Sequence, residues 1–330
     1  MVLTERPKES ESEKITTTKD KHEASAYGRR LFACHRKIIL RKSLISFLRR
    51  NATIRIQSNF RTKEGQCEMK VYEFGDKQKP AILLLPGTCC YWRSNFGHVI
   101  EPLQKSFYVC CVSYDGFDDT EDTEFPSMLE ETAKIENYIK EKHGGHVRAA
   151  YGCSLGGSFV GLLAARENIQ MDYGILGGSD LDQAGAFKTK LLCKIAMPLL
   201  YPFIHDGQFK QKFMQKKMKK IMENGSGYEK TFMNMMKTPE GKCLSFISRE
   251  SVERQFASDM ITPLPDHISP KHGEIHIIYA LQMGEKYRKR YYQHFAKPVL
   301  HEFNMKHEEL LACHKEEWVR TIEEICIPKE

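Results

Sequence analysis

Short runs of apolar residues recur along most of the chain, separated by stretches in which apolar residues return every three or four positions. The runs are typical of strands buried on both faces, and the stretches between them are typical of helices. Six runs predict strands: AILLLPG, SFYVCCVSYDG, VRAAYGC, YGILGGSD, EIHIIYAL and PVLHEF. Before them, TIRIQSNFRT and CEMKVYEF alternate as an antiparallel pair does. The pattern predicts an α/β fold with a doubly wound, mostly parallel sheet.

One long segment breaks this alternation. Residues 183–271 carry no clear strand signal, and their periodicity is helical, with many Met, Phe and Lys residues. A structureless loop of that length is unusual inside a compact domain. We therefore predict a helical insertion that divides the sheet domain into residues 51–182 and residues 272–330.

The N-terminal part has a different composition. Residues 1–26 are polar and repetitive, which predicts a disordered tail. Residues 27–50 hold eight basic residues and no acidic one, and their apolar positions fit an amphipathic helix. Such a helix can make peripheral contact with an anionic membrane. The alternative, favoured by the frequency of surface helices, is that it packs its apolar stripe on the domain.

Composition and charge narrow the class of protein. The 330 residues are 41% hydrophobic and 28% charged, as in soluble globular proteins. No apolar run reaches the roughly 18 residues of a membrane span, and the first residues do not resemble a secretory signal. The net charge of +7 is concentrated in residues 27–50, which argues against nucleic-acid binding. Eleven cysteines without CxxC or zinc spacing predict free thiols in a cytoplasmic protein.

A serine stands between two glycines where a predicted strand passes into a predicted helix. In YGCSLGG the spacing is Gly152-x-Ser154-x-Gly156. A serine on such a tight turn takes strained backbone angles and projects its hydroxyl, and only glycine leaves room on either side. The lysine of a phosphate-binding loop and the GxGxxG fingerprint are both absent here. The context favours a nucleophile at Ser154 over an ordinary glycine-rich turn.

Four features fall in the order found in one large superfamily. LLLPG, VSYDG, YGCSLGG and a histidine after the last strand make residues 51–327 resemble the α/β-hydrolases. The resemblance implies a Ser…Asp/Glu…His triad in that chain order, and acyl hydrolysis through a covalent serine intermediate. It also implies that the insertion is a cap or lid. Such a mechanism needs no metal or organic cofactor.

The triad base implied by this order is a histidine that follows Ser154. His307 lies on the loop between the last predicted strand and the last helix, where an imidazole can reach a serine oxygen. The other histidines after Ser154 fall in predicted strands, in helices or in the insertion and its edge. We therefore choose His307.

The triad acid is less well defined. Met283 occupies the usual place after the seventh strand, and Glu285 comes two residues late. Asp180 follows the sixth strand, where some relatives carry the acid, and Asp182 is a third choice. We prefer Asp180, with Glu285 close behind. The acid would orient the imidazole and stabilise its charged form.

The oxyanion hole and the substrate follow from the same resemblance. Its donors would be the N–H of Leu155 and that of Thr88 or Cys89. A Met- and Phe-rich insertion favours a small acyl or hydrophobic substrate, unless those residues only form the insertion's own core. The first hypothesis is a serine hydrolase of carboxylic esters. The alternatives are a hydrolase of peptide, thioester or C–C bonds, and a binding protein that has kept the fold without turnover.

The acidic run DGFDDTEDTEF follows a predicted strand. It lacks the spacing of a calcium-binding loop, and it predicts a solvated connection in which Asp115 and Gly116 shape the turn.

Overall fold

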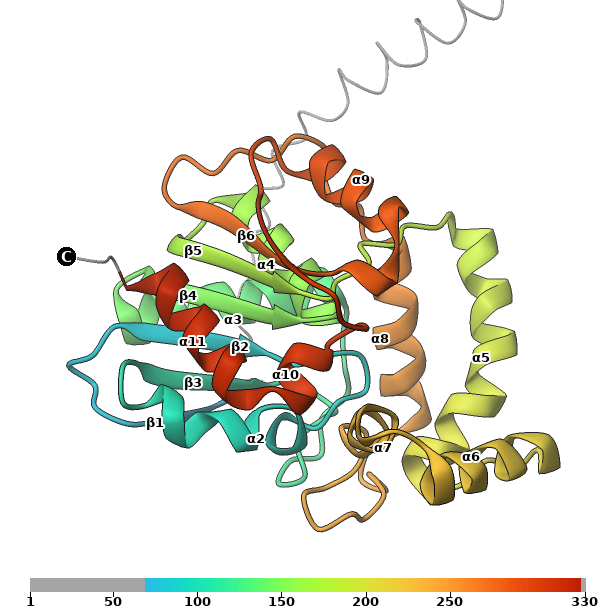
Figure 1. Ribbon diagram of the computed structural model, residues 1–330. Helices are drawn as coiled ribbons and strands as arrows, with labels where there is room; N and C mark the ends of the chain where they lie inside the picture. Colours follow the sequence, from blue (N-terminus) through green and yellow to red (C-terminus); the bar gives the residue numbers. More distant parts are fainter. Residues whose placement is uncertain (1–68, 328–330) are drawn as a thin grey trace, which may run out of the picture. The chain divides into compact units, whose positions relative to one another are not determined.

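The computed structural model describes residues 69–327, and its centre is one seven-stranded sheet (Figure 1). The strands are β1 (Lys70–Phe74), β2 (Ala81–Leu85), β3 (Tyr108–Ser113), β4 (His146–Cys153), β5 (Gln170–Gly177), β6 (Glu274–Ala280) and β7 (Val299–Phe303). Their order is β1-β3-β2-β4-β5-β6-β7; β1 is antiparallel to β3 and every other pairing is parallel. This confirms the predicted sheet. The expectations for residues 1–26, 27–50 and the strand TIRIQSNFRT lie outside the described residues.

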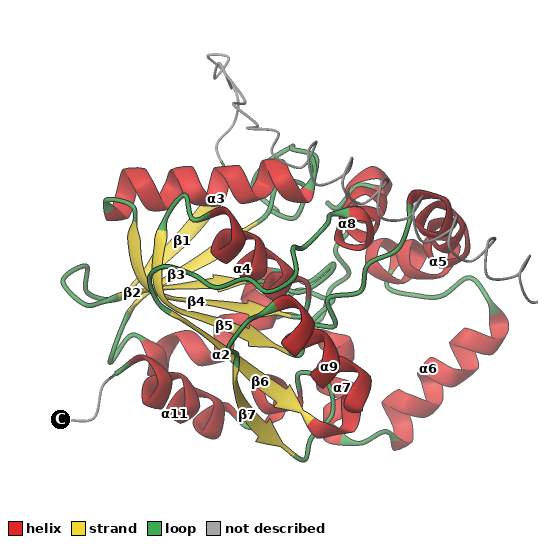
Figure 2. Cartoon of the chain, turned by 90° about the horizontal axis from the view of Figure 1, so that it is seen from above, coloured by secondary structure: helices red, strands yellow, loops and turns green. Residues whose placement is uncertain are grey.

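Helices cover both faces of the sheet. They are α2 (Trp92–Leu103), α3 (Met128–His143), α4 (Leu155–Arg166), α9 (Glu285–His294), α10 (Glu309–Cys313) and α11 (Lys315–Cys326), with a 3-10 helix η1 (Leu281–Met283). Helices α2 and α11 lie on one face and α3 and α4 on the other, as in a doubly wound fold (Figures 1 and 2). The sequence predicts one C-terminal helix, but the non-helical backbone of His314 divides it into α10 and α11.

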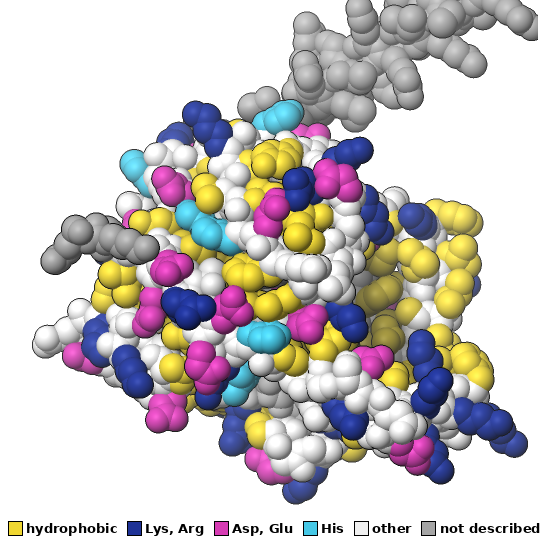
Figure 3. Space-filling view, in the orientation of Figure 1, with side chains coloured by type: hydrophobic (Ala, Val, Ile, Leu, Met, Phe, Trp, Pro, Cys, Tyr) yellow, Lys and Arg dark blue, Asp and Glu magenta, His cyan; other side chains and the backbone are white. Residues whose placement is uncertain are grey.

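The connection from β5 to β6 is helical and lies beyond the carboxyl ends of the strands (Figure 1). It contains α5 (Ala186–Asp206), α6 (Lys212–Asn224), α7 (Gly227–Asn234) and α8 (Arg249–Ile261). Helix α5 packs against α8, and α7 packs against α10. Figure 3 shows hydrophobic side chains gathered over α5 and basic side chains gathered over α6. The helical character agrees with the sequence, while the bounds and covering role of the insertion stay predictions.

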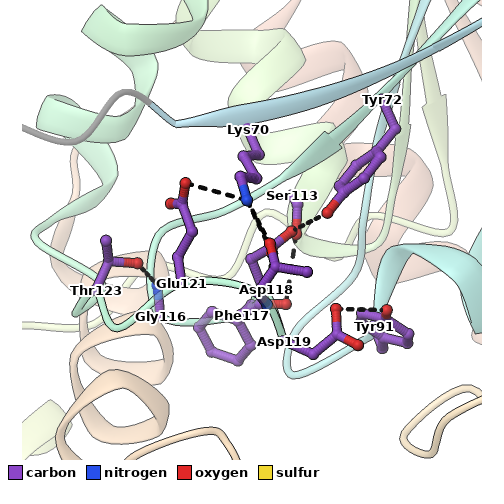
Figure 4. A network of polar contacts seen from close by, with 11 residues as sticks. Lys70, Tyr72, Tyr91, Ser113, Gly116, Phe117, Asp118, Asp119, Glu121 and Thr123 are labelled. Carbon is purple, nitrogen blue, oxygen red and sulfur yellow. Dashed lines mark hydrogen bonds and ion pairs between the residues drawn. The ribbon is translucent and has the colours of Figure 1, made fainter.

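Ion pairs and a hydrogen bond join the acidic run after β3, residues 115–125, to β1, so this run is not fully solvated. The Lys70 ammonium lies 3.3 Å from Glu121 and 3.9 Å from Asp118 (Figure 4). The Tyr72 hydroxyl donates to Asp118 over 2.9 Å. Asp118 is buried, and so is Asp115. The prediction of a solvated loop is therefore wrong for these two carboxylates. Buried charges need such partners, and for Asp118 β1 supplies them.

The cysteines of the described residues agree with the expectation of free thiols. Nine cysteines are free and seven of them are buried. None of the helices between residues 69 and 327 combines the length and the apolar character needed to cross a membrane.

Candidate functional site

Ser154 is held in a strained turn between β4 and α4. Its backbone angles are φ 50° and ψ −109°, a combination that costs a non-glycine residue about 1–3 kcal/mol. A side chain at Gly152 would come within 2.1 Å of the Gly156 carbonyl, and one at Gly156 within 2.1 Å of the Leu85 oxygen. Both glycines are therefore required by close backbone contacts. The turn has the geometry that the sequence predicts.

The main-chain N–H of Ser154 is shared between two acceptors. It donates to the Gly177 carbonyl over 2.8 Å and to Glu308 Oε1 over 2.9 Å. The side chain is partly exposed, and its hydroxyl forms no hydrogen bond within residues 69–327. The hydroxyl is thus available to a substrate, while the backbone below it is fixed.

A buried carboxylate lies directly beneath the serine. Glu308 Oε2 accepts a hydrogen bond from the Tyr151 hydroxyl over 3.0 Å. Among the described residues Glu308 has no Lys or Arg partner, and burial raises its pKa above the ordinary value. The charge of His307 and the hydrogen bonds from Ser154 and Tyr151 act in the opposite direction. The sequence did not single out Glu308, because a glutamate at the start of a helix ordinarily faces solvent.

His307 lies beside the same turn. A side chain at Gly178 would lie 3.0 Å from His307 Nδ1 and 2.9 Å from Glu308 Oε1, so both groups contact the loop that follows β5. The Tyr228 hydroxyl of α7 donates to the His307 carbonyl over 2.8 Å. The ring of Phe232, also on α7, meets the imidazole edge-on, with centroids 6.0 Å apart. The imidazole makes no hydrogen bond to another described residue, Ser154 included.

The three candidate acids lie on two segments: Asp180 and Asp182 follow β5, and Glu285 begins α9. Asp180 comes two residues after Gly178, on the turn that His307 Nδ1 contacts. Its Oδ1 accepts the Asp182 N–H over 3.3 Å, a local turn contact. Asp182 itself is exposed and pairs with an arginine of α9. Glu285 is exposed at the start of α9, where it pairs with Arg288 over 3.5 Å. Neither Asp180 nor Glu285 forms a hydrogen bond or an ion pair with the His307 imidazole.

The loop after β2 supplies the second candidate donor of an oxyanion hole. The Gly87 N–H donates to Asn95 Oδ1 over 3.0 Å, and the Cys89 N–H donates to Gln255 Oε1 over 2.7 Å. Within residues 69–327 the N–H groups of Thr88 and Leu155 have no protein acceptor. Thr88 therefore fits the role better than Cys89. Asn95 and Gln255 fix this loop from α2 and α8, and no local sequence signal pointed to either.

A hydrogen bond also joins the loop after β2 to the acidic run. The Tyr91 hydroxyl donates to Asp119 over 2.9 Å, and Tyr91 precedes α2 (Figure 4). The Cys90 N–H donates to the Gly87 carbonyl over 3.1 Å. These contacts connect the acidic run to the loop that carries Thr88.

The thiols near Ser154 are suited to packing rather than to nucleophilic attack. Cys89, Cys90 and Cys153 are buried. Burial raises the pKa of all three, that of Cys90 to about 12. A thiol with such a pKa is protonated at neutral pH and reacts slowly. Ser154 differs from these cysteines in being partly exposed.

The carboxylate of Asp259, on α8, has a pKa that the charge of Asp180 affects. Burial is the main cause that raises the pKa of Asp259, on α8, to about 7, and the charge of Asp180 adds to it. The Asp180 charge therefore favours the protonated form of Asp259.

Comparisons with known proteins identify similar folds. No family model matches the sequence, and no curated protein matches it. Among solved structures, an α/β-hydrolase family protein from Desulfitobacterium hafniense is 19% identical, with a TM-score of 0.59 over 78% of this chain and 99% of that one. A marine microorganism esterase is 14% identical, with a TM-score of 0.58 over 79% and 100%. A 1H-3-hydroxy-4-oxoquinoline 2,4-dioxygenase is 16% identical, with a TM-score of 0.52 over 78% and 95%.

Proposed function

We propose that this chain, which has the α/β-hydrolase fold, is a serine hydrolase that cleaves carboxylic esters or related acyl compounds. The observation that carries the proposal is the backbone of Ser154, which has a positive φ and is followed by the free N–H of Leu155. A turn of this kind presents a hydroxyl at the start of a helix, where developing negative charge is stabilised. The three solved structures named above are at most 19% identical to this chain, so they support its fold alone. The support for the chemistry comes from the residues of the site.

The proposed reaction proceeds through an acyl-enzyme. Ser154 Oγ attacks the acyl carbon while His307 accepts its proton, and the N–H groups of Leu155 and Thr88 bind the oxyanion. His307 then protonates the leaving alcohol. Water, activated by the same imidazole, hydrolyses the acyl-enzyme. Because apo enzymes often show long catalytic contacts, the absent hydrogen bond between Ser154 and His307 is compatible with closure on substrate binding.

In this proposal two carboxylates, those of Asp180 and Glu308, act on the His307 imidazole. His307 Nδ1 contacts the turn that carries Asp180, which supports Asp180 over Glu285 as the orienting acid. Glu308 is a positioning residue, because it holds the Ser154 N–H and borders the same turn. Its charge also offsets the imidazolium formed during the reaction.

The insertion supports a hydrophobic substrate of modest size. Helix α7 contacts the His307 loop through Tyr228 and Phe232, which supports a covering role. Partly buried methionines of α6, α7 and the following turn pack on the core: Met214, Met218, Met233 and Met236. Thioether chains adapt to irregular shapes, so they suit the wall of an acyl pocket.

The test is turnover of a series of p-nitrophenyl esters of increasing acyl length. The wild-type chain should hydrolyse them, and Ser154→Ala should abolish hydrolysis while it keeps the folded circular-dichroism spectrum. Peptide and thioester panels measured in parallel test the other bond types. Hydrolysis that survives Ser154→Ala would exclude this serine as the nucleophile.

A second candidate function is a binding protein with this fold. The absence of a hydrogen bond between Ser154 and His307 favours it. It predicts no turnover on any panel, together with saturable binding of an acyl compound that Ser154→Ala leaves intact.

A further inference from the structure

Helix α5 is apolar on two opposite faces. Thr189, Cys193 and Met197 are buried on the face that meets the rest of the protein. Phe187, Leu191 and Ile195 follow the same spacing two residues earlier, and they are 87%, 50% and 59% exposed. With 3.6 residues per turn, that offset places the two sets on opposite sides of the helix. A helix with apolar residues on two opposite faces is ordinarily covered on both.

Helix α6 adds exposed basic side chains next to the stripe of α5. It buries none of its residues, and Lys212, Lys216, Lys219 and Lys220 fall on one side of it by the helical repeat. We call the exposed side chains of α5 and α6, residues 186–224, the α5–α6 face. Large apolar groups left exposed together mark a binding surface more often than a free one.

The charge of this face is predominantly positive. Residues 186–224 contain nine lysines and only two acidic residues, Asp206 and Glu223. All nine lysines are exposed, and within the described residues only Lys219 has an acidic partner, Glu223. Lys188 flanks the apolar stripe of α5 on one side and Lys194 on the other, by the helical repeat. Figure 3 shows hydrophobic side chains over α5 beside basic side chains over α6.

We propose that the α5–α6 face docks on the surface of an anionic phospholipid membrane. Such a surface offers hydrocarbon to Phe187, Leu191 and Ile195 and phosphate groups to the surrounding lysines, a pairing typical of interfacial helices. A second copy of the chain fits less well, because a two-fold contact would set the same lysines against each other. The charge pattern therefore selects anionic lipid as the occupant.

This surface lies on the side of the molecule that holds Ser154. Helix α5 packs on α8, and Gln255 of α8 holds the loop of Thr88. Docking would thus bring the insertion against the lipid. The proposal does not depend on the reaction, because the lysines and the apolar stripe are separate from Ser154 and His307. A Ser154→Ala chain should bind lipid as the wild type does.

The test is co-sedimentation of the full chain with vesicles of phosphatidylcholine alone or mixed with phosphatidylserine. Wild type should bind the mixed vesicles and bind the neutral ones far less. Lys216→Gln/Lys220→Gln should weaken binding about 30-fold, at about 1 kcal/mol for each lysine near the membrane. Its matched control is Lys140→Gln/Lys142→Gln on α3, which should leave binding unchanged.

The apolar contribution is tested by Phe187→Ser/Leu191→Ser/Ile195→Ser, which should weaken binding at least about tenfold. Its control is Leu129→Ser/Tyr292→Ser, at exposed apolar positions of α3 and α9. Every variant keeps residues 27–50, so a loss reports on the α5–α6 face. Equal binding to both vesicle types, no binding, or equal losses in control and test variants would overturn the proposal. So would a fall in the molar mass of the lipid-free chain on removing the stripe, which would indicate a contact between copies.

Discussion

Glu308 Oε1 accepts a hydrogen bond from the main-chain N–H of Ser154 over 2.9 Å, across 154 positions of the chain. This contact attaches the loop after β7 to the turn after β4. Because His307 precedes Glu308 directly, the same contact fixes where the imidazole enters the site. The buried carboxylate therefore connects the stability of the turn to the proposed chemistry.

Glu308→Gln should make the protein less active and more stable at neutral pH. The amide oxygen can still accept the Ser154 N–H, but the negative charge is lost. We expect kcat to fall roughly 10–100-fold with little change in KM, as for loss of a charge-assisted hydrogen bond. Steady-state kinetics on an ester measures both. An unchanged kcat would leave Glu308 a purely structural group.

The stability effect of Glu308→Gln has a defined pH dependence. Burial raises the folded-state pKa of Glu308 above its ordinary 4.5, so the folded protein binds more protons than the unfolded chain between these values. Wild-type stability therefore falls as pH rises through this window. The variant lacks that loss, so its advantage in denaturant unfolding should appear above about pH 4.5 and vanish below it. An advantage independent of pH would contradict the assignment.

Asp180→Asn should distinguish the two acids predicted from the sequence. If Asp180 orients His307, kcat should fall by roughly 10²–10⁴-fold, because the imidazole loses its tautomer preference. Glu285→Gln is the matched control, and it should stay within about twofold, since Glu285 is exposed and paired with Arg288. The reverse pattern would assign the acid to α9.

Gly156→Ala should disrupt the turn of Ser154. The new methyl group would lie 2.1 Å from the Leu85 oxygen, a distance that backbone atoms cannot relieve cheaply. We expect loss of activity together with a destabilisation above about 2 kcal/mol. Gly97→Ala is the control within α2, where no atom lies within 4 Å, and it should stabilise the protein by about 0.5–1 kcal/mol. Thermal melts of both variants measure the contrast.

Asp259→Asn should stabilise the protein above neutral pH. Burial raises the folded-state pKa of Asp259 from 3.8 to about 7, so wild-type stability falls as pH rises between these values. The asparagine does not titrate, and its advantage should grow through this window and level off above about pH 7. Urea unfolding at several pH values would show it. A variant that is less stable than wild type at high pH would mean that the carboxylate has a cation partner.

The local parts of the fold were predictable from the sequence, and the long-range contacts were not. The turn of Ser154 was recognisable because its glycines and flanking strand lie within a few residues. The burial of Asp118 was missed, because Lys70 and Tyr72 come from a strand more than forty residues earlier. Glu308 was missed for the same reason, since its burial depends on the distant turn after β4.

The helices of residues 183–271 were predicted from periodicity, but their contacts were not. Periodicity shows that α5 carries an apolar stripe, and only the structure shows that Phe187, Leu191 and Ile195 are exposed. The contact of Tyr228 with the loop of His307 likewise depends on how α7 packs.

The most direct test of the central claim is to treat the folded chain with a fluorophosphonate and locate the adduct by peptide mass spectrometry. The account predicts one adduct on Ser154, formed more slowly in His307→Ala and absent in Ser154→Ala. An adduct on another residue, or none on a chain that hydrolyses esters, would contradict it.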